Sequence, residues 1–310
     1  MTSVSLLGCA GTREAARTDP TDAALYETAP PEERDFVLAG GFIHGKMTIP
    51  AGSIEIARPV IVNPLLDPAR LLARGAVVVR YHLNWESIPT PQPPTESAAE
   101  RKARNPVGTW LLASPSAAVI GRGYFQLTWS AGKSAKRVCE YLATLPFVDP
   151  DRIGMAGMST NGFKVFSALL AGTPLRAAVV VAACADYHSF LRGSPIALNG
   201  ASLDLDPAYE SWLRAHEPVR HASRFTDTAL LTVNGGEDHV IPTDCVDLSA
   251  PILRREYERA GGVQRFRQAW FSDATHNELV DRADAEILAW WVRWLGLDDL
   301  ETAGEDAPPR

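Results

Sequence analysis

Short apolar runs alternate with amphipathic segments along most of this chain. Runs with the length and composition of buried strands lie at 59–63, 76–84, 152–157, 175–185, 228–236 and 263–271. Segments in which apolar residues recur at helical spacing lie at 64–75, 129–145, 163–172, 250–262 and 283–296. Strands that alternate with helices pair in parallel through right-handed crossovers. The pattern therefore predicts an α/β fold, with a mostly parallel twisted sheet flanked by helices.

Turn and cap residues mark two of the predicted element boundaries. In the segment 64–75, Asp67 is placed to cap a helix with Pro68 at its first position, and Gly75 is placed to end it. The segment 36–52 contains two short β patterns joined at a Gly-Gly turn. We therefore expect two strands joined by this turn ahead of the alternating region.

Two interruptions break the alternation. The first, at about 86–118, begins with a long Pro-rich polar stretch, and the second, at about 186–225, is expected to hold short helices. Long connections of this kind in a compact domain are usually lids or loose surface loops. The chain thus divides into an N-terminal leader or arm at 1–34, one domain at 35–296 whose two insertions could build a cap, and a flexible tail at 297–310.

Composition excludes several classes of function. A chain of 310 residues with 46% hydrophobic content can bury a large core. The net charge is −7 and no block of like charges stands out, which argues against a nucleic-acid groove or a polybasic membrane surface. No apolar run reaches the length of a membrane span.

The cysteines are few and far apart: Cys9, Cys139, Cys184 and Cys245. They fit neither a zinc spacing nor a disulfide framework, so each is expected to be a small buried apolar residue or a surface thiol. Cys9 ends the stretch LLGC, which looks like a bacterial lipoprotein cleavage site. The expected location is the cytoplasm, and a lipoprotein anchored at Cys9 is the alternative.

The candidate chemistry lies at the corner between a predicted strand and the helix after it. Ser159 stands there in the stretch GMSTN, residues 157–161. A sharp strand-to-helix turn lifts a serine above the carboxyl edge of the sheet and puts the next backbone N–H at a helix N-terminus, where negative charge is favoured. This is the geometry of the nucleophile elbow, G-x-S-x-G. Ser159 is therefore a candidate nucleophile, and a serine that only caps the helix is the alternative.

An elbow enzyme also needs an acid and then a histidine later in the chain, each on a loop after a strand. Asp238 follows the apolar run 228–236, and His276 lies between the last strand pattern and the last helix pattern. The histidine would accept the serine proton, while the carboxylate would fix the histidine tautomer and stabilise the imidazolium. Ser159, Asp238 and His276 are therefore predicted to be catalytic.

Other titratable residues compete for these roles. Asp186 follows the run 175–185 and is an alternative acid, whereas Glu237 lies outside the usual turn position. None of the other histidines follows the last strand, although His82 and His188 follow strands and could line the pocket. No pair of His, Asp or Glu has convincing metal spacing, so we expect no metal and no other cofactor.

With these residues, the chain resembles the α/β-hydrolase family, and within it the dienelactone-hydrolase and peptidase-like esterase branch. The stretches VDPDRIGMAGMS and EPVRHASRFTDTALLTVNGGEDHVIP carry the resemblance, which covers about 35–296. It implies a largely parallel eight-stranded sheet, often with antiparallel first strands, and hydrolysis of an ester, amide, thioester or lactone through an acyl-serine. Carried over residue by residue, it makes Ser159 the nucleophile, His276 the base and Asp238 the acid.

Two positions depart from the family pattern. The strained serine usually has very small neighbours two residues away on each side, and Gly157 meets this requirement whereas Asn161 does not. Asn tolerates unusual backbone angles, and its amide could brace the turn. The family often has a His-Gly pair after the third strand, but here Pro64 follows the strand and has no N–H to donate. The expected oxyanion-hole donors are the backbone N–H groups of Thr160 and Leu65.

These features predict a serine hydrolase that cleaves a small or medium carboxylic ester, thioester, lactone or amide. Trp85, Tyr187 and Trp212 lie in or beside the insertions and are candidate pocket residues, with packing of the insertions as the alternative. An acyltransferase or cyclase that uses the same acyl-serine, and a catalytically inactive binding module, are the alternative functions. The expected partner is a small-molecule acyl substrate. A homodimer is left open, and neither nucleic acid nor stable membrane insertion is expected.

Overall fold

The computed structural model describes residues 30–51, 56–83, 117–194 and 207–297. Eight strands in these ranges form one sheet in the order β1-β2-β4-β3-β5-β6-β7-β8. β1 pairs with β2, and β2 with β4, in antiparallel fashion, while all the other neighbours pair in parallel. This arrangement confirms the predicted fold class, including the antiparallel strands at one side.

The strands are β1 Glu32–Leu38, β2 Ile43–Ile49, β3 Arg58–Val62, β4 Val77–Leu83, β5 Val148–Met158, β6 Ala177–Val181, β7 Ala229–Glu237 and β8 Phe266–Thr275. The α-helices are α1 Pro68–Ala73, α3 Ala117–Leu142, α4 Thr160–Leu170, α5 Tyr187–Gly193, α6 Pro207–His216, α7 Thr243–Arg259, α8 Leu279–Arg282 and α9 Asp284–Leu295. Short 3₁₀ helices lie at η1 Ala39–Gly41, η3 Pro218–Phe225 and η4 Val263–Arg265.

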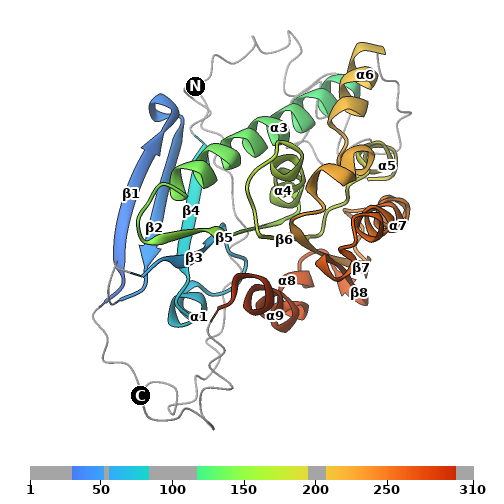
Figure 1. Ribbon diagram of the computed structural model, residues 1–310. Coiled ribbons are helices and arrows are strands. Elements are labelled where there is room, and N and C mark those ends of the chain that lie inside the picture. Colours follow the sequence, from blue (N-terminus) through green and yellow to red (C-terminus); the bar gives the residue numbers. More distant parts are fainter. Residues whose placement is uncertain (1–29, 52–55, 84–116, 195–206, 298–310) are drawn as a thin grey trace.

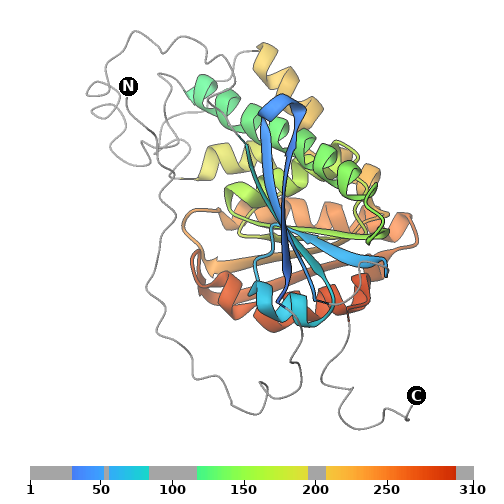
Figure 2. The ribbon, with the colours of Figure 1, turned by 90° about the vertical axis from the view of Figure 1, so that its left-hand side faces the viewer.

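Helices cover both faces of the sheet, with α3 and α4 on one face and α1 and α9 on the other (Figure 1). The second view shows the strong twist of the sheet and how far the β1–β2 ribbon rises from it (Figure 2). All five residues of the central strand β6 are buried, as expected for a strand with helices on both sides. This is why the central strands have nearly continuous apolar sequences rather than alternating ones.

The local signals in the sequence have the expected structural roles. The carboxylate of Asp67 accepts a hydrogen bond from the backbone N–H of Ala69 at 3.0 Å, and Pro68 begins α1. Gly75 has a positive φ of 76° just after the helix. The turn between β1 and β2 contains Gly40 and Gly41, both with positive φ. These predictions are confirmed.

Several element boundaries differ from the sequence prediction: β1 begins at Glu32, inside the segment assigned to the leader, and α7 begins at Thr243 rather than at residue 250. The helix expected at 129–145 begins at Ala117, so α3 contains residues that we assigned to the first insertion. The strand expected from residue 263 begins at Phe266, because Val263–Arg265 form a 3₁₀ turn. Helix ends and strand starts depend on tertiary packing more than on local composition, and most of the first insertion lies outside the described residues.

The closing helix α9 packs directly on the central strands. Trp290 and Trp291 are buried, so these tryptophans belong to the core. A Cβ on Gly154 in β5 would lie 2.8 Å from both Trp291 and Leu295, so only glycine lets the helix approach this closely. The second insertion begins with α5 and continues with α6 and η3 in its described portions.

Candidate active site

Ser159 occupies the corner between β5 and α4, as predicted. Its backbone has φ 55° and ψ −123°, a combination that residues other than glycine rarely adopt. Two hydrogen bonds maintain this conformation: the Ser159 N–H donates to the carbonyl of Val181 at 2.9 Å, and the Ser159 carbonyl accepts from the N–H of Phe163 at 3.1 Å. The first anchors the elbow to β6 and the second begins α4. Ser159 therefore has the backbone of a nucleophile elbow, and its side chain makes no capping hydrogen bond.

The neighbours of Ser159 show which side of the elbow requires a small residue. A Cβ on Gly157 would lie 2.2 Å from the carbonyl oxygen of Asn161, a distance no real Cβ adopts. Asn161 itself is exposed, and its side-chain oxygen accepts a hydrogen bond from Lys164 at 2.8 Å. A Cβ on Gly162 would lie 2.8 Å from that of Ala183, so this glycine lets α4 approach β6. Asn161 is tolerated because its side chain projects away from the crowded turn.

Asp238 follows β7, and its carboxylate is almost completely buried. One carboxylate oxygen, Oδ1, accepts hydrogen bonds from the backbone N–H groups of Val240 and Ile241, both at 2.9 Å. These bonds define the short turn between β7 and α7 and fix the orientation of the carboxylate.

His276 follows β8 and faces this carboxylate. Its Nδ1 lies 3.0 Å from Oδ1 and 2.9 Å from Oδ2 of Asp238, so Nδ1–H donates to the acid and Nε2 is left on the opposite side of the ring. The end of β8 before His276 is held by Glu278, whose carboxylate accepts hydrogen bonds from the N–H and the hydroxyl of Thr275 at 2.9 and 2.7 Å. The pair predicted from sequence spacing is therefore formed, 38 residues apart along the chain.

Two glycines of β7 allow β8 to lie close enough for this pair. A Cβ on Gly235 would lie 2.3 Å from the carbonyl oxygen of Ala274, and one on Gly236 would lie 2.3 Å from that of Ser272. The register between β7 and β8 shifts between Gly235 and Glu237, which is a bulge or irregularity of the kind that bends a strand. Our sequence interpretation missed this role, although the Gly-Gly pair two residues before Asp238 is a visible signal.

The elbow and the His–Asp pair belong to the same edge of the sheet. β5, β6, β7 and β8 are consecutive and parallel, so Ser159, Asp238 and His276 all follow the carboxyl ends of their strands. Among the residues that the structure describes, no hydrogen bond joins the Ser159 hydroxyl to His276. In unliganded enzymes this contact is often long and tightens only with substrate.

The predicted oxyanion donors lie on the two segments that flank the elbow. Thr160 is the first residue of α4, where backbone N–H groups point out of the helix end. Leu65 follows β3, which is the sheet neighbour of β5. The turn after β3 is shaped by Asn63, which has a positive φ of 52° and accepts a hydrogen bond from the N–H of Tyr81 at 3.3 Å. The role of both donors stays a prediction.

Of the three candidate pocket residues, Tyr187 makes packing contacts, which was the alternative, and its place in a substrate pocket stays a prediction. It is buried, its ring stacks on that of Phe125 at 3.9 Å, and its hydroxyl lies 3.2 Å from that of Ser167. Tyr187 therefore packs α5 against α3 and α4. Trp212 is half-buried and stacks on His216 at 4.3 Å, and Trp85 lies outside the described residues.

The alternative acid Asp186 is engaged elsewhere. Its carboxylate caps α5 by accepting from the N–H of Ser189 at 2.9 Å. It lies beside His188, whose Nδ1 and Nε2 contact Glu217 at 2.8 Å and Glu210 at 2.9 Å. Since His276 pairs with Asp238, the structure favours Asp238 as the acid.

The group Asp186, His188 and Glu217 has ligand atoms within 4.8 Å of one another, a spacing that a metal ion could use. Both ring nitrogens of His188 are already engaged by carboxylates, and Arg220 donates to Glu217 at 2.6 Å. The hydrogen bond to Glu217 raises the pKa of His188, which favours an imidazolium at this position. We interpret the group as a charged network that joins α5, α6 and η3.

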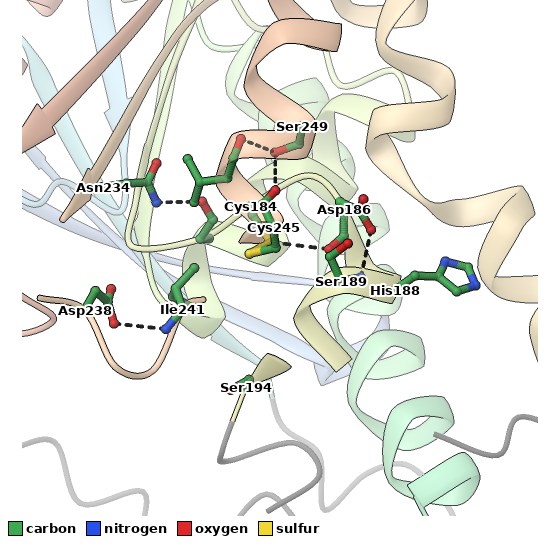
Figure 3. The surroundings of a disulfide bond; sticks show 12 residues. Cys184, Asp186, His188, Ser189, Ser194, Asn234, Asp238, Ile241, Cys245 and Ser249 are labelled. Atoms are coloured by element: carbon green, nitrogen blue, oxygen red, sulfur yellow. Dashed lines mark hydrogen bonds between the residues drawn. A yellow bond between two sulfur atoms is a disulfide. The ribbon is translucent and has the colours of Figure 1, made fainter. Parts of the chain in front are cut away.

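The sequence prediction for two cysteines was wrong. Cys184, which follows β6, forms a disulfide bond with Cys245 in the first turn of α7, and their Cα atoms are 5.9 Å apart (Figure 3). The two residues are 61 positions apart, and only the packing of α7 beside the end of β6 brings them together. Cys139 is buried and free, as expected. Within the described ranges, none of the helices is long and apolar enough to cross a membrane.

A comparison of the sequence with protein families finds a match to a family of hydrolases. Residues 134–298, just over half of the chain, match the model of the prolyl oligopeptidase family. No curated protein sequence matches the chain.

Solved structures similar to this one include dipeptidyl peptidase 4 of Porphyromonas gingivalis, with a TM-score of 0.57 and 16% identity over 87% of this chain and 36% of that one. TT1662 from Thermus thermophilus has a TM-score of 0.56 and 18% identity over 87% of this chain and 100% of that one. An acylaminoacyl peptidase in complex with a peptide chloromethyl ketone has a TM-score of 0.56 and 18% identity over 88% of this chain and 43% of that one.

These identities show a shared fold only. The chain spans less than half of the two peptidases but the full length of TT1662. The sheet and the similar structures confirm the α/β-hydrolase fold, and the family match confirms the peptidase-like branch that the sequence resembled. The finer likeness to dienelactone hydrolases stays a prediction. Together with the family match, the elbow and the His276–Asp238 pair lead to one conclusion: this chain belongs to the prolyl oligopeptidase family of serine hydrolases.

Proposed function

We propose that the chain hydrolyses a small or medium carboxylic ester or amide through an acyl intermediate on Ser159. The observation that carries this proposal is the ordered His276–Asp238 pair at the sheet edge where the strained elbow lies. Asp238 is buried and held by two backbone N–H groups, so it orients the imidazole rather than moving with it. A serine, a base and an orienting acid are the parts that acyl transfer requires.

In the acylation step, the Ser159 hydroxyl attacks the substrate carbonyl carbon and His276 Nε2 takes its proton. Asp238 keeps the tautomer that carries the proton on Nδ1 and stabilises the imidazolium that forms. The negative charge on the carbonyl oxygen is stabilised by the N–H of Thr160 at the start of α4 and by that of Leu65 after β3.

Acylation is completed when the imidazolium donates its proton to the leaving alcohol or amine and the bond between that group and the carbonyl carbon breaks. In deacylation, a water molecule deprotonated by His276 attacks the acyl-serine, and His276 then returns the proton to the Ser159 oxygen as the acid is released. An alcohol or amine in place of this water would give acyl transfer or cyclisation by the same residues.

Two observations bear on whether the bond is an ester or an amide. The sequence resembles esterases, which favours an ester, whereas the matched family and several similar structures are named as peptidases, which favours an amide. Hydrolysis of an amide depends more strongly on protonation of the leaving amine, which the His276–Asp238 pair can supply. We therefore propose both an ester and an amide as possible substrates, whose acyl and leaving groups are to be identified. A homodimer is also left open.

The test is reaction with a fluorophosphonate probe, followed by a substrate panel. We expect labelling at Ser159 in the wild type and in the control Ser223→Ala, which alters an exposed serine on η3, and no labelling in Ser159→Ala. Matched p-nitrophenyl esters and aminoacyl p-nitroanilides then separate ester from amide cleavage. Folded wild type without a label at Ser159 would instead indicate a binding module. A label with turnover only when an alcohol or amine is added would indicate acyl transfer.

The sequence led us to expect a cytoplasmic location, which stays untested. The disulfide is an argument against that location. Disulfides are rare in the reducing cytosol and common in exported proteins. The buried Cys184–Cys245 bond therefore favours an exported protein, and among exported proteins the lipoprotein is proposed from the LLGC stretch alone. Mass spectrometry of the native-source protein under non-reducing conditions, with detection of a lipid on Cys9, distinguishes the two.

A further inference from the structure

The loop that carries Asp238 is fastened to a segment that contributes nothing directly to the chemistry. We call residues 238–242 the acid loop and residues 184–194, from the end of β6 through α5, the insertion base. In Figure 3 the disulfide and Ser194 lie to one side of the acid loop, which is drawn with Asp238 bonded to Ile241. The two segments are far apart in sequence and are connected at three points, one through the first turn of α7 and two directly.

The first point is the disulfide. Cys184 begins the insertion base, and Cys245 lies three residues beyond the acid loop in the first turn of α7. The Cys245 N–H donates to the carbonyl of Pro242 at 3.2 Å, so the helix end and the acid loop are continuous. The Cys245 carbonyl also accepts from the Ser249 hydroxyl at 2.7 Å.

The second and third points lie at the other end of the insertion base. The Ser194 hydroxyl donates to the carbonyl of Val240 at 2.7 Å, and Ser194 is buried. Val240 is also one of the two residues whose N–H binds the Asp238 carboxylate. Beside it, a Cβ on Gly193 would lie 2.9 Å from the ring of Pro242, so the insertion base packs directly on the end of the acid loop.

The two residues just before the insertion base, Ala182 and Ala183, are anchored to the sheet. The Ala182 N–H donates to the carbonyl of Val233 at 2.8 Å, and the buried side chain of Asn234 donates to the carbonyl of Ala183 at 3.1 Å. Both acceptor and donor groups on the sheet side belong to β7, the strand that leads into Asp238. The acid loop is thus held at its start by β7 and at its end by the insertion base.

We propose that the Cys184–Cys245 disulfide and Ser194 are positioning residues for the reaction. They hold the acid loop so that the Asp238 carboxylate keeps His276 oriented toward Ser159. This inference rests on the proposed function. Neither group touches the substrate carbonyl, and each acts through the loop. Because Cys184 is 2% and Cys245 0% exposed, the bond is closed to aqueous reductants in the folded chain. We call the disulfide and the Ser194–Val240 hydrogen bond together the clasp.

Three variants test the clasp. Cys184→Ala with Cys245→Ala removes the disulfide without leaving a thiol, and Ser194→Ala removes only the hydrogen bond to Val240. Cys139→Ala is the matched control, because it also removes a buried cysteine sulfur but lies on α3, away from the acid loop. A non-reducing peptide map first verifies that Cys184 and Cys245 are linked in the wild type. An unlinked pair overturns the disulfide part of the proposal.

The measurements are kcat and KM, the rate of fluorophosphonate labelling, and the downfield proton NMR signal of His276 Nδ1–H, assigned by its loss in His276→Ala. We expect kcat and the labelling rate to fall about 100-fold in the double variant and about tenfold in Ser194→Ala, with little change in KM, because misplacement by about 1 Å has such effects. The NMR signal is expected to broaden in both. Wild-type rates and a sharp signal in both variants, as in Cys139→Ala, would overturn the proposal.

The outcomes separate this inference from the proposed function. If wild type is labelled at Ser159 and the folded variants match it, the clasp fails and the function stands. If wild type is not labelled, the function fails, and the NMR signal alone decides whether the clasp orders the His276–Asp238 pair. Should the double variant not fold, Ser194→Ala decides by the same measurements.

Discussion

Gly157 and Asn161 lie so close across the elbow that a Cβ on Gly157 would be 2.2 Å from the Asn161 carbonyl oxygen. Gly157→Ala must therefore displace the first turn of α4, on which Ser159 and the Thr160 N–H depend. We expect a loss of about 100-fold in kcat and of about 1–3 kcal/mol in the free energy of unfolding. Steady-state kinetics and urea unfolding measure the two effects. Asn161→Ala is the control, because its side chain is exposed, and wild-type kinetics in Gly157→Ala would contradict this account.

The two candidate acids can be separated by paired substitutions. Asp238→Asn keeps the shape of the side chain but favours the wrong tautomer of His276, and we expect kcat to fall about 10⁴-fold. Asp186→Asn retains a residue that caps α5 well and is expected to leave kcat nearly unchanged. Turnover of an activated ester measures both, with circular dichroism to verify folding. The reverse order of effects would assign the acid to Asp186.

The charged network around His188 predicts a specific pH dependence of stability. Its hydrogen bond to Glu217 raises the pKa of His188 above the ordinary value, and Glu210 acts in the same direction. The stabilisation by His188 is therefore fully present below the unfolded pKa, about 6.5, and is lost as the pH rises through the folded pKa. His188→Gln is expected to cost about 1–3 kcal/mol near pH 6 and less at higher pH.

The carboxylates of the same network set the lower limit of the pH range in which the network stabilises the fold. The hydrogen bond from His188 lowers the pKa of Glu210. Burial acts to raise the pKa of Glu217, but its hydrogen bonds from His188 lower it overall. Both acids contribute stability above their unfolded pKa values that is lost as the pH falls through the folded ones. Urea unfolding of wild type and His188→Gln from pH 5.5 to 8.5 tests the histidine. A difference that grows with pH would contradict the prediction.

The disulfide should also contribute to stability apart from any effect on catalysis. It closes a loop of 61 residues, and the chain-entropy argument gives roughly 4 kcal/mol for a loop of this size. We expect the free energy of unfolding of the Cys184→Ala, Cys245→Ala double variant to fall by about this amount. Urea unfolding under non-reducing conditions measures it. Cys139→Ala, which removes a buried thiol without opening a loop, should lose less.

The elements of this protein and the places of its reactive groups were readable from the sequence. Alternating apolar and amphipathic segments predicted the parallel sheet, because buried strands and packed helices impose different periods on the chain. The candidate residues Ser159, Asp238 and His276 were placed after strands from the sequence, because the proposed chemistry needs side chains there and strand ends are visible in the sequence, and the structure has each of them after a strand. The cap at Asp67 and the turn at Gly40 were equally local, since each is determined by a few neighbouring residues.

The contacts between groups that are distant in the sequence could be seen only once the chain was folded. The Cys184–Cys245 bond, the burial of Tyr187 and the carboxylates on His188 each depend on how α5, α6 and α7 pack, and no short pattern encodes that packing. The hydrogen bond of His276 to Asp238 rather than to Asp186 likewise depends on how closely β7 and β8 approach at Gly235 and Gly236. Local sequence determines the conformation of a segment, whereas contacts between segments depend on the shape of the whole core.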